Sequence, residues 1–262
     1  MSVDADTGGR ILLERTGPVL RILLSNPGRH NALTWRMYDE FDTALEQASA
    51  DPSIRVVVIR GQGTAFAAGT DITQFASFTT GEQGLRYEQR VGAILGRLLG
   101  LDIPVIAAVD GPAVGAGLAI AACSDVVVAT DASTFGVPIA RTVGNCIPPA
   151  VLRRLQARMG PGRTMAMLLT ASLVPAHEAQ KAGFVHTVVP RDEFDDTLER
   201  LSTRMSRTAP ITVAALKEMD RRLQEDPTAE ADDLLLRCYG SEDFREGVAA
   251  FTEHRTPRWK GL

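Results

Sequence analysis

The apolar positions in the first half of the chain switch repeatedly between strand-like and helix-like spacing. Two short apolar runs, 11–13 and 19–24, flank the turn signal Gly17-Pro18 and predict a β-hairpin. Continuous β-branched runs predict buried strands at 55–60, 104–109 and 125–129. Apolar residues at helical spacing predict helices at 31–50, 85–99 and 118–123. This alternation predicts an α/β core of stacked β-α units with crossover helices.

After Pro149 the pattern becomes mainly helical. Helices are predicted up to 159, over 163–169 and from 175, followed by a strand at 185–189 and then by helices as far as 253. We therefore predict an α/β core over residues 1–200 and a helical C-terminal region over 201–262. The second region is too small to bury its own apolar faces well, so we expect it to dock on another subunit.

Composition and charge narrow the classes of function. The chain has 262 residues, of which 45% are hydrophobic and 23% charged, and its formal net charge is −4. This balance is typical of a globular protein without a basic surface, so neither nucleic acid nor a membrane is an expected partner. The uncharged run 111–124 is too short and too rich in glycine for a membrane span. The first ten residues lack the basic start and apolar stretch of a secretory signal, which predicts a cytoplasmic protein.

The usual motifs for nucleotides, hydrolysis and metals do not occur. Glycine-rich turns at 61 and 115 fail the dinucleotide fingerprint, because Phe66 and Ile120 stand where its third glycine belongs. No phosphate loop and no GxSxG elbow is present. The three cysteines and four histidines are scattered, so we expect neither a disulfide framework nor a bound metal.

Two glycine-containing turns remain, at 66–71 and 111–117, each next to a predicted buried strand. Their small side chains would let a ligand approach backbone N–H groups. Two such groups from separate turns can form a hole for a developing oxyanion, with a helix N-terminus adding a favourable dipole. The alternative is that these glycines serve only the close packing of turn on strand.

Several strings, taken together and in order, resemble the crotonase (enoyl-CoA hydratase/isomerase) superfamily. They are SNPGRHNAL at 25–33, AFAAGTDI at 65–72, PVIAAVDGPAVGAG at 104–117 and FGVP at 135–138. The likeness continues through LTA at 169–171, AQKAGF at 179–184 and SEDFREG at 241–247, and so covers nearly the whole chain.

The resemblance implies a crotonase-like spiral of stacked ββα units with a helical C-terminal trimerisation region. It also implies a homo-oligomer, either a trimer or a hexamer, and an acyl-CoA substrate. No separate cofactor is implied, since coenzyme A is part of the substrate. The backbone N–H groups of Thr70 and Ala116 should form the oxyanion hole that holds the thioester carbonyl oxygen.

Coenzyme A contacts are implied at Arg29, His30, Ala68 and Ile72. For His30 the alternative is a solvated loop histidine. Asp71 follows the oxyanion position and is grouped with these binding residues. We interpret its side chain as a helix N-cap, with catalysis as the alternative.

Two further contacts are implied from a neighbouring subunit, at Phe251 and His254. His254 stands where relatives often carry lysine. A histidine would be mostly uncharged at neutral pH and would bind phosphate more weakly.

The sequence departs from the family pattern at the positions that carry the two glutamates of its hydratases, which here are Ala119 and Ile139. Neither side chain can transfer a proton. Arg141 could bind a carboxylate or stabilise negative charge, or it could form a salt bridge within the trimer. Other residues close in sequence that could replace the glutamates are Thr142, Asn145 and Cys146. The resemblance adds three candidates for an acid or base on the helix that family members place over the acyl pocket, namely Glu82, Tyr87 and Glu88.

These residues predict an enzyme that stabilises a thioester enolate but is a poor hydratase. Its reaction could be isomerisation, decarboxylation, racemisation or carbon–carbon cleavage. The alternative is a catalytically silent acyl-CoA-binding or scaffold protein, because a fold does not guarantee chemistry.

Overall fold

The structure is a computed structural model that describes residues 8–262. Its larger sheet has the strand order β1-β2-β3-β4-β6-β9. These strands are β1 (Arg10–Thr16), β2 (Val19–Ser25), β3 (Val56–Gly61), β4 (Val105–Val109), β6 (Val126–Thr130) and β9 (Thr187–Val189). β1 and β2 form the predicted antiparallel hairpin, and each later strand pairs in parallel with the one before it. The hairpin and the buried strands of the sequence analysis are thus confirmed.

A second sheet has the order β5-β7-β8. Its strands are β5 (Pro112–Val114), β7 (Thr134–Gly136) and β8 (Val174–Pro175). β5 follows β4 and β7 follows β6 after short turns, so successive units of the chain contribute one strand to each sheet. The sequence did not locate these strands, since two or three residues are too few to show a periodicity.

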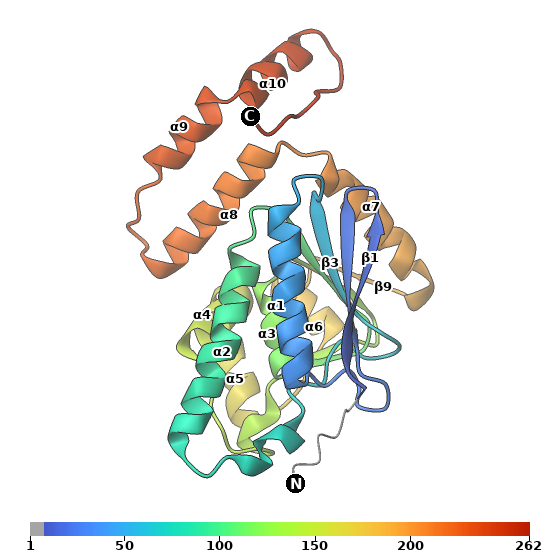
Figure 1. Cartoon of the computed structure of the whole chain (residues 1–262), viewed down its shortest axis with the longest axis vertical. Coiled ribbons are helices and arrows are strands. Elements are labelled where there is room, and N and C mark those ends of the chain that lie inside the picture. Colours follow the sequence, from blue (N-terminus) through green and yellow to red (C-terminus); the bar gives the residue numbers. More distant parts are fainter. Residues whose placement is uncertain (1–7) are drawn as a thin grey trace.

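Helices cover both faces of the larger sheet because its central strands are apolar on both sides. On one face, Val57 and Ile59 belong to the main core beneath α1 (Trp35–Ala50), α2 (Gly81–Leu99) and α3 (Ala116–Cys123). On the other face, Val56 and Val58 pack against Phe194 of α7 (Phe194–Ser206). Figure 1 shows α7 on the side of the sheet opposite to α1 and α2.

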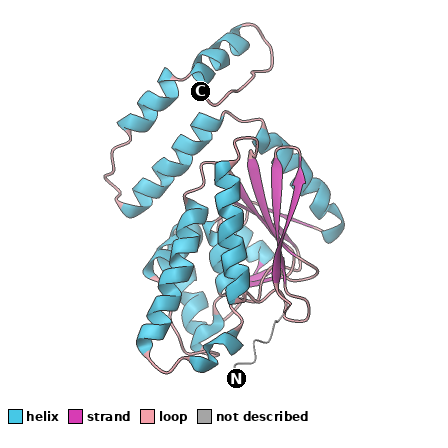
Figure 2. Ribbon diagram, viewed as in Figure 1, coloured by secondary structure: helices cyan, strands magenta, loops and turns pink. Residues whose placement is uncertain are grey.

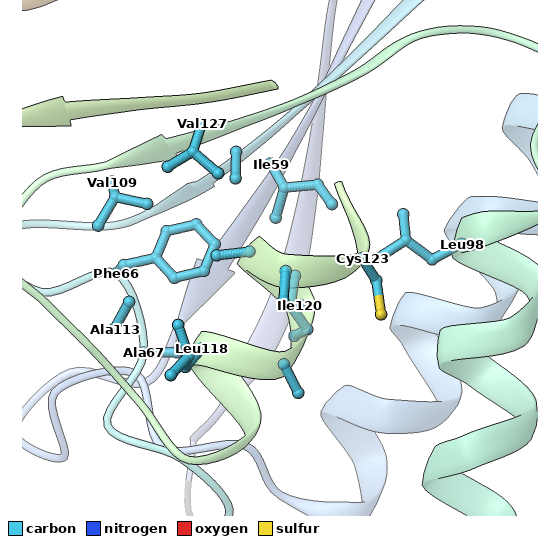
Figure 3. Close-up of a cluster of buried hydrophobic side chains, with 14 of the residues drawn as sticks. Ile59, Phe66, Ala67, Leu98, Val109, Ala113, Leu118, Ile120, Cys123 and Val127 are labelled. Carbon is cyan, nitrogen blue, oxygen red and sulfur yellow. The ribbon is translucent and has the colours of Figure 1, made fainter. Parts of the chain in front are cut away.

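α3 lies at the centre of the main core, and all of its residues from Gly117 to Cys123 are buried. In Figure 3 its side chains lie between strand residues such as Val127 and Leu98 of α2. Because the helix end is buried, its last carbonyl groups need donors from the protein. Arg154 and Arg158 supply them, both donating to the carbonyl oxygen of Ala122 at 2.9 and 3.0 Å. α3 is thereby held firmly at its C-terminal end.

Two helices begin four residues away from their predicted starts. α1 begins at Trp35 rather than at 31, because His30 and Asn31 have positive φ angles of 47° and 57° that a helix cannot contain. α2 begins at Gly81, ahead of the predicted 85. Its polar first turn is stabilised by the Gln83 side chain, which accepts a hydrogen bond from Thr80 N at 3.0 Å.

The second half of the chain is mainly helical, as predicted, and its helices, like those of the first half, are cyan in Figure 2. Its elements are α4 (Pro149–Met159), α5 (Pro161–Thr170), α6 (Ala176–Lys181), α7, α8 (Pro210–Glu225), α9 (Asp232–Gly240) and α10 (Glu242–Thr252). Short 3₁₀ helices occur at η1 (Ile72–Ser77), η2 (Pro138–Ala140) and η3 (Arg191–Glu193). Within residues 8–262, no helix is long and apolar enough to cross a bilayer.

The last helices extend away from the sheets, with α9 and α10 farthest from the core in Figure 1. α8 is attached to the core by Lys217, whose ammonium group donates to the Ile103 carbonyl oxygen at 3.0 Å and pairs with Asp125. Large apolar side chains of this tail are exposed at Leu216, Leu223, Leu235, Leu236, Tyr239, Phe244, Val248 and Phe251. The tail does not bury its own apolar faces, as its small size predicted.

Gly117 gives a test of how closely the core is packed. A Cβ added at this residue would lie 2.3 Å from the carbonyl oxygen of Ala67, a backbone atom that cannot move aside. We expect Gly117→Ala to lower the free energy of unfolding by about 1–3 kcal/mol in urea denaturation. Gly92→Ala is the matched control, because nothing lies within 4 Å of its added Cβ on the exposed side of α2. The control should raise stability by about 0.5–1 kcal/mol, and equal effects of the two would contradict the packing argument.

Candidate active site

The two glycine turns lie against each other where β3 and β4 end. Ala67 N donates to the Pro112 carbonyl oxygen at 3.1 Å, and Val114 N donates to the Ala67 carbonyl oxygen at 2.9 Å. A Cβ added at Gly69 would lie 3.3 Å from the Val114 carbonyl oxygen and 3.8 Å from Ala116 N. Glycine at residue 69 therefore lets the two turns approach closely, so that Thr70 and Ala116 lie beside the same space.

The N–H groups of Thr70 and Ala116 are both free to bind a ligand. Leu33 exchanges hydrogen bonds with the residues on either side of Thr70, so Thr70 N is directed away from that pairing. Ala116 is the first residue of α3, where an N–H group has no partner within the helix. Among the hydrogen bonds formed by residues 8–262, neither group acts as a donor. The two N–H groups can thus donate to an oxygen placed between the turns.

A cavity of about 280 Å³ opens next to these two groups. Apolar side chains from α2, α3, η2 and the loop before α4 form most of its wall. Glu88 is the one carboxylate among its lining residues, which are Ala68, Gly69, Thr70, Ile72, Phe75, Tyr87, Glu88, Val91, Leu95, Val114, Gly115, Ala116, Ala119, Val137, Pro138, Ile139, Thr142, Val143, Asn145, Cys146, Ile147, Pro148 and Val151. Such a wall suits an apolar group whose polar end reaches the two N–H donors.

The side chain of Thr70 lies between two tyrosines. Its hydroxyl oxygen is 2.7 Å from the hydroxyl of Tyr38 on α1 and 2.7 Å from that of Tyr87 on α2. Burial is the main reason why the pKa of Tyr38 lies well above its usual value, and it also raises the pKa of Tyr87. Both phenols therefore stay protonated near neutral pH and hold the turn at 66–71 against two helices. Nothing local in the sequence reveals this row of three hydroxyl groups, because its members are 32 and 17 positions apart.

Glu88 is the most unusual titratable group of the cavity. It forms no hydrogen bond or ion pair with any residue of the described chain 8–262, and it is only partly exposed. Burial raises its pKa from the usual 4.5 to about 7. The carboxyl group is therefore partly protonated and partly ionised at neutral pH.

The sequence model of the enoyl-CoA hydratase/isomerase family matches residues 14–262. The chain belongs to the enoyl-CoA hydratase/isomerase family. It is 32% identical to 2,3-dehydroadipyl-CoA hydratase of Escherichia coli over 96% of this chain and 98% of the relative. It is 33% identical to carnitinyl-CoA dehydratase of Proteus mirabilis over 95% and 97% of the two chains.

A solved structure of the same family shows the same fold. The enoyl-CoA hydratase/carnithine racemase of Magnetospirillum magneticum superposes with a TM-score of 0.90 at 34% identity, over 96% of each chain. The predicted α/β crotonase fold with C-terminal helices is thus confirmed.

The structure places most of the predicted binding residues of this enoyl-CoA hydratase/isomerase family member in or beside the turn at 66–71. Ala68 and Ile72 line the cavity, and Ala68 N donates to the His30 carbonyl oxygen at 2.9 Å. Asp71 is buried and caps η1, as predicted, by accepting from Thr73 N at 3.1 Å. The Arg29 guanidinium lies 4.0 Å from the Asp71 carboxylate and is half exposed.

The residues considered as proton donors or acceptors lie in different places. Thr142, Asn145 and Cys146 line the cavity together with Tyr87 and Glu88. Arg141 is exposed and does not belong to the lining. Glu82 lies in the exposed first turn of α2, also outside the lining.

Phe251 and His254 do not reach the cavity within one chain. Phe251 lies on α10 and is 84% exposed, and His254 follows the end of that helix. Figure 1 shows α10 at the far end of the molecule from η1 and α2. Their contact with a ligand held by a neighbouring subunit stays a prediction.

No metal site accompanies this cavity in the described part of the chain. Residues 8–262 contain no group of three or more histidine, cysteine, aspartate or glutamate side chains that could hold a metal ion.

We expect Thr70→Val to be more destabilising than Thr70→Ser. Valine keeps the shape of threonine but removes the hydroxyl, so that the buried Tyr38 hydroxyl loses its 2.7 Å contact, at a cost of about 1–3 kcal/mol. Serine keeps the hydroxyl and loses only a methyl group. The free energies of unfolding from urea titration measure this difference, and equal values would show that the hydroxyl chain does not stabilise the turn.

Proposed function

We propose that this protein is an acyl-CoA enzyme that stabilises a thioester enolate. The thioester carbonyl oxygen would accept hydrogen bonds from Thr70 N and Ala116 N, and the acyl group would enter the apolar cavity beside them. The observation that carries this proposal is the pair of unpartnered N–H groups on two touching turns. Two relatives support the substrate class, because the names 2,3-dehydroadipyl-CoA hydratase and carnitinyl-CoA dehydratase each specify an acyl-CoA.

Two N–H donors lower the energy of the enolate because they bind the oxygen on which negative charge develops. Each such donor in a preorganised site is worth about 3–4 kcal/mol. The amino end of α3 adds a partial positive charge at the same point. Because the donors are main-chain N–H groups, they are present although the side chains here are those of threonine and alanine.

A silent acyl-CoA-binding protein is the second candidate function. The observation that favours it is the side chains of Ala119 and Ile139, which line the cavity and cannot transfer protons. Hydrogen exchange separates the two candidates. The protein is incubated with a panel of acyl-CoA thioesters in heavy water, and α-deuterium is measured by mass spectrometry. Incorporation supports an enolate-forming enzyme, whereas binding without incorporation supports the silent protein.

Ala116 offers a precise test of the oxyanion hole. Ala116→Pro removes one N–H donor at the first residue of a helix, where proline is tolerated. We expect it to reduce α-deuterium incorporation by about 10²–10³-fold. Ala116→Gly keeps the donor and should retain most of the rate. Similar rates in the two variants would contradict the role assigned to Ala116.

We also expect slow hydration of crotonyl-CoA. Addition of water requires one group to deprotonate the water and another to deliver a proton to the α-carbon, and each contributes about 10²–10⁴-fold. Ala119 and Ile139 supply neither. A family member with both glutamates serves as the reference in a spectrophotometric assay. The double change Ala119→Glu with Ile139→Glu should raise the rate, and fast hydration by the unmodified chain would refute this prediction.

Assembly as a trimer or a hexamer belongs to the same proposal, because the apolar faces of α8, α9 and α10 are exposed in a single chain. Light scattering should show an oligomer at micromolar concentration. Removal of residues 241–262 should weaken both the assembly and the affinity for coenzyme A, since it removes Phe251 and His254. A full-length monomer, or unchanged affinity after truncation, would contradict the corresponding part of the proposal.

A further inference from the structure

Enolate formation needs a base that can reach the α-carbon of the acyl group. Among the lining residues that belong to the described part of the chain, 8–262, the titratable side chains are Tyr87, Glu88 and Cys146. The Tyr87 hydroxyl is bound to Thr70, and burial raises its pKa, so it does not accept a proton near neutral pH. The Cys146 side chain is exposed and its thiol is directed to the neighbouring Ile147 carbonyl oxygen at 3.6 Å. Glu88 remains.

Glu88 is held at the oxyanion turn by the residue before it. The Tyr87 hydroxyl lies 2.7 Å from the Thr70 hydroxyl, and its ring packs edge-on against Phe75 at 4.9 Å and Trp35 at 5.5 Å. These contacts fix the rotation of this turn of α2. They leave Glu88 in the wall of the cavity into which the two N–H donors open.

Within residues 8–262, no cation forms an ion pair with Glu88. The titratable groups on its side of α2 are the phenols of Tyr38 from α1 and Tyr87 from α2, whose pKa values its charge raises, and the Cys146 thiol across the cavity. The part of α3 in the wall contributes only backbone and small side chains.

The basic residues of α2 that lie against α1 are paired elsewhere. Arg90 pairs with Asp39, and Arg97 pairs with Asp42 and Glu46. No ion pair to Glu88 is formed within residues 8–262, so its carboxylate keeps the basicity that burial gives it.

We propose, on the basis of the enolate chemistry proposed above, that Glu88 is the acid–base residue of this enzyme. Its carboxylate takes a proton from the α-carbon of the bound acyl group. The electron pair of that C–H bond becomes the enolate double bond, and the negative charge moves to the thioester oxygen between Thr70 N and Ala116 N. The carboxyl proton of Glu88 exchanges with solvent before a proton returns to the same carbon, which gives isotope exchange at that carbon. Its delivery to the γ-carbon of a β,γ-unsaturated acyl group instead gives isomerisation.

The resemblance implies two glutamates in the hydratases of this family, at the positions of Ala119 on α3 and Ile139 in η2. In the arrangement proposed here a single carboxylate on α2 takes their place. This arrangement suits reactions that remove and return a single proton. It does not suit hydration, which needs a second group to activate water. The substrate class is therefore an acyl-CoA with an acidic α-hydrogen and an apolar acyl group.

The test compares α-deuterium incorporation in the full-length protein and three variants. Glu88→Gln keeps the size of the side chain and removes the base, and should slow incorporation by about 10²–10⁴-fold. Glu88→Asp keeps a carboxylate one methylene shorter and should retain an intermediate rate. Glu46→Gln on α1 is the matched control, because this exposed carboxylate pairs with Arg97 outside the cavity, and its rate should equal that of the unmodified protein. The affinity of each variant for free coenzyme A, measured by calorimetry, should stay within about threefold and reports that the site is folded.

The pH profile supplies a readout that a structural role of Glu88 would not change. Because the ionised form is the base, the rate in the unmodified protein should rise with pH through about 7 and then level off. The rise should be absent in Glu88→Gln. Incorporation that persists in Glu88→Gln with the same profile overturns this inference and leaves the proposed function standing. Absence of incorporation in the unmodified protein overturns both.

Discussion

The contact between the two glycine turns is the constraint on which the site depends. Backbone meets backbone at this point, and any side chain at Gly117 would collide with the Ala67 carbonyl oxygen. The parallel strands β3 and β4 bring the turns to the same edge of the larger sheet, and the second sheet begins directly beyond them. α3 then starts at the contact and is held at its other end by Arg154 and Arg158. The positions of Thr70 N and Ala116 N thus follow from the packing of the whole core.

Much of the fold could be predicted from local pattern, because burial imposes a period on the longer elements. The β-branched runs of β3, β4 and β6 and the hairpin before them carry that signal clearly. The short strands of the second sheet do not, since they are held by their position between longer elements rather than by their own sequence. The start of α1 depended on the positive φ at Asn31, whose amide donates to the carbonyl oxygen of Ala65, a contact across 34 positions.

The site likewise has features that local sequence pattern predicts and features that depend on contacts distant in sequence. The two glycine turns could be located because glycine and small residues mark them in the sequence. The resemblance placed Glu88 among the candidates but could not separate it from Glu82 and Tyr87 on the same helix, since a glutamate on an amphipathic helix usually faces solvent. Only the packing of α2 against α1 and η1 shows that this carboxylate faces an apolar cavity, where its ionisation opposes the stability of the fold. Strained or unfavourable groups of this kind are commonly retained where they serve chemistry.

The use of main-chain donors has a consequence for how the protein can evolve. Backbone N–H groups are present with every residue except proline, so mutation can alter the cavity wall while the two donors stay in place. Ala119 lies one turn along α3 from Ala116, and Ile139 lies in η2, so both can change without moving the donors. A lineage can therefore exchange one set of proton-transfer groups for another by single substitutions, each tested against an unchanged core. The fold thus separates the two backbone donors, which depend on the packing of the core, from the side chains of the cavity wall, which substitution can alter.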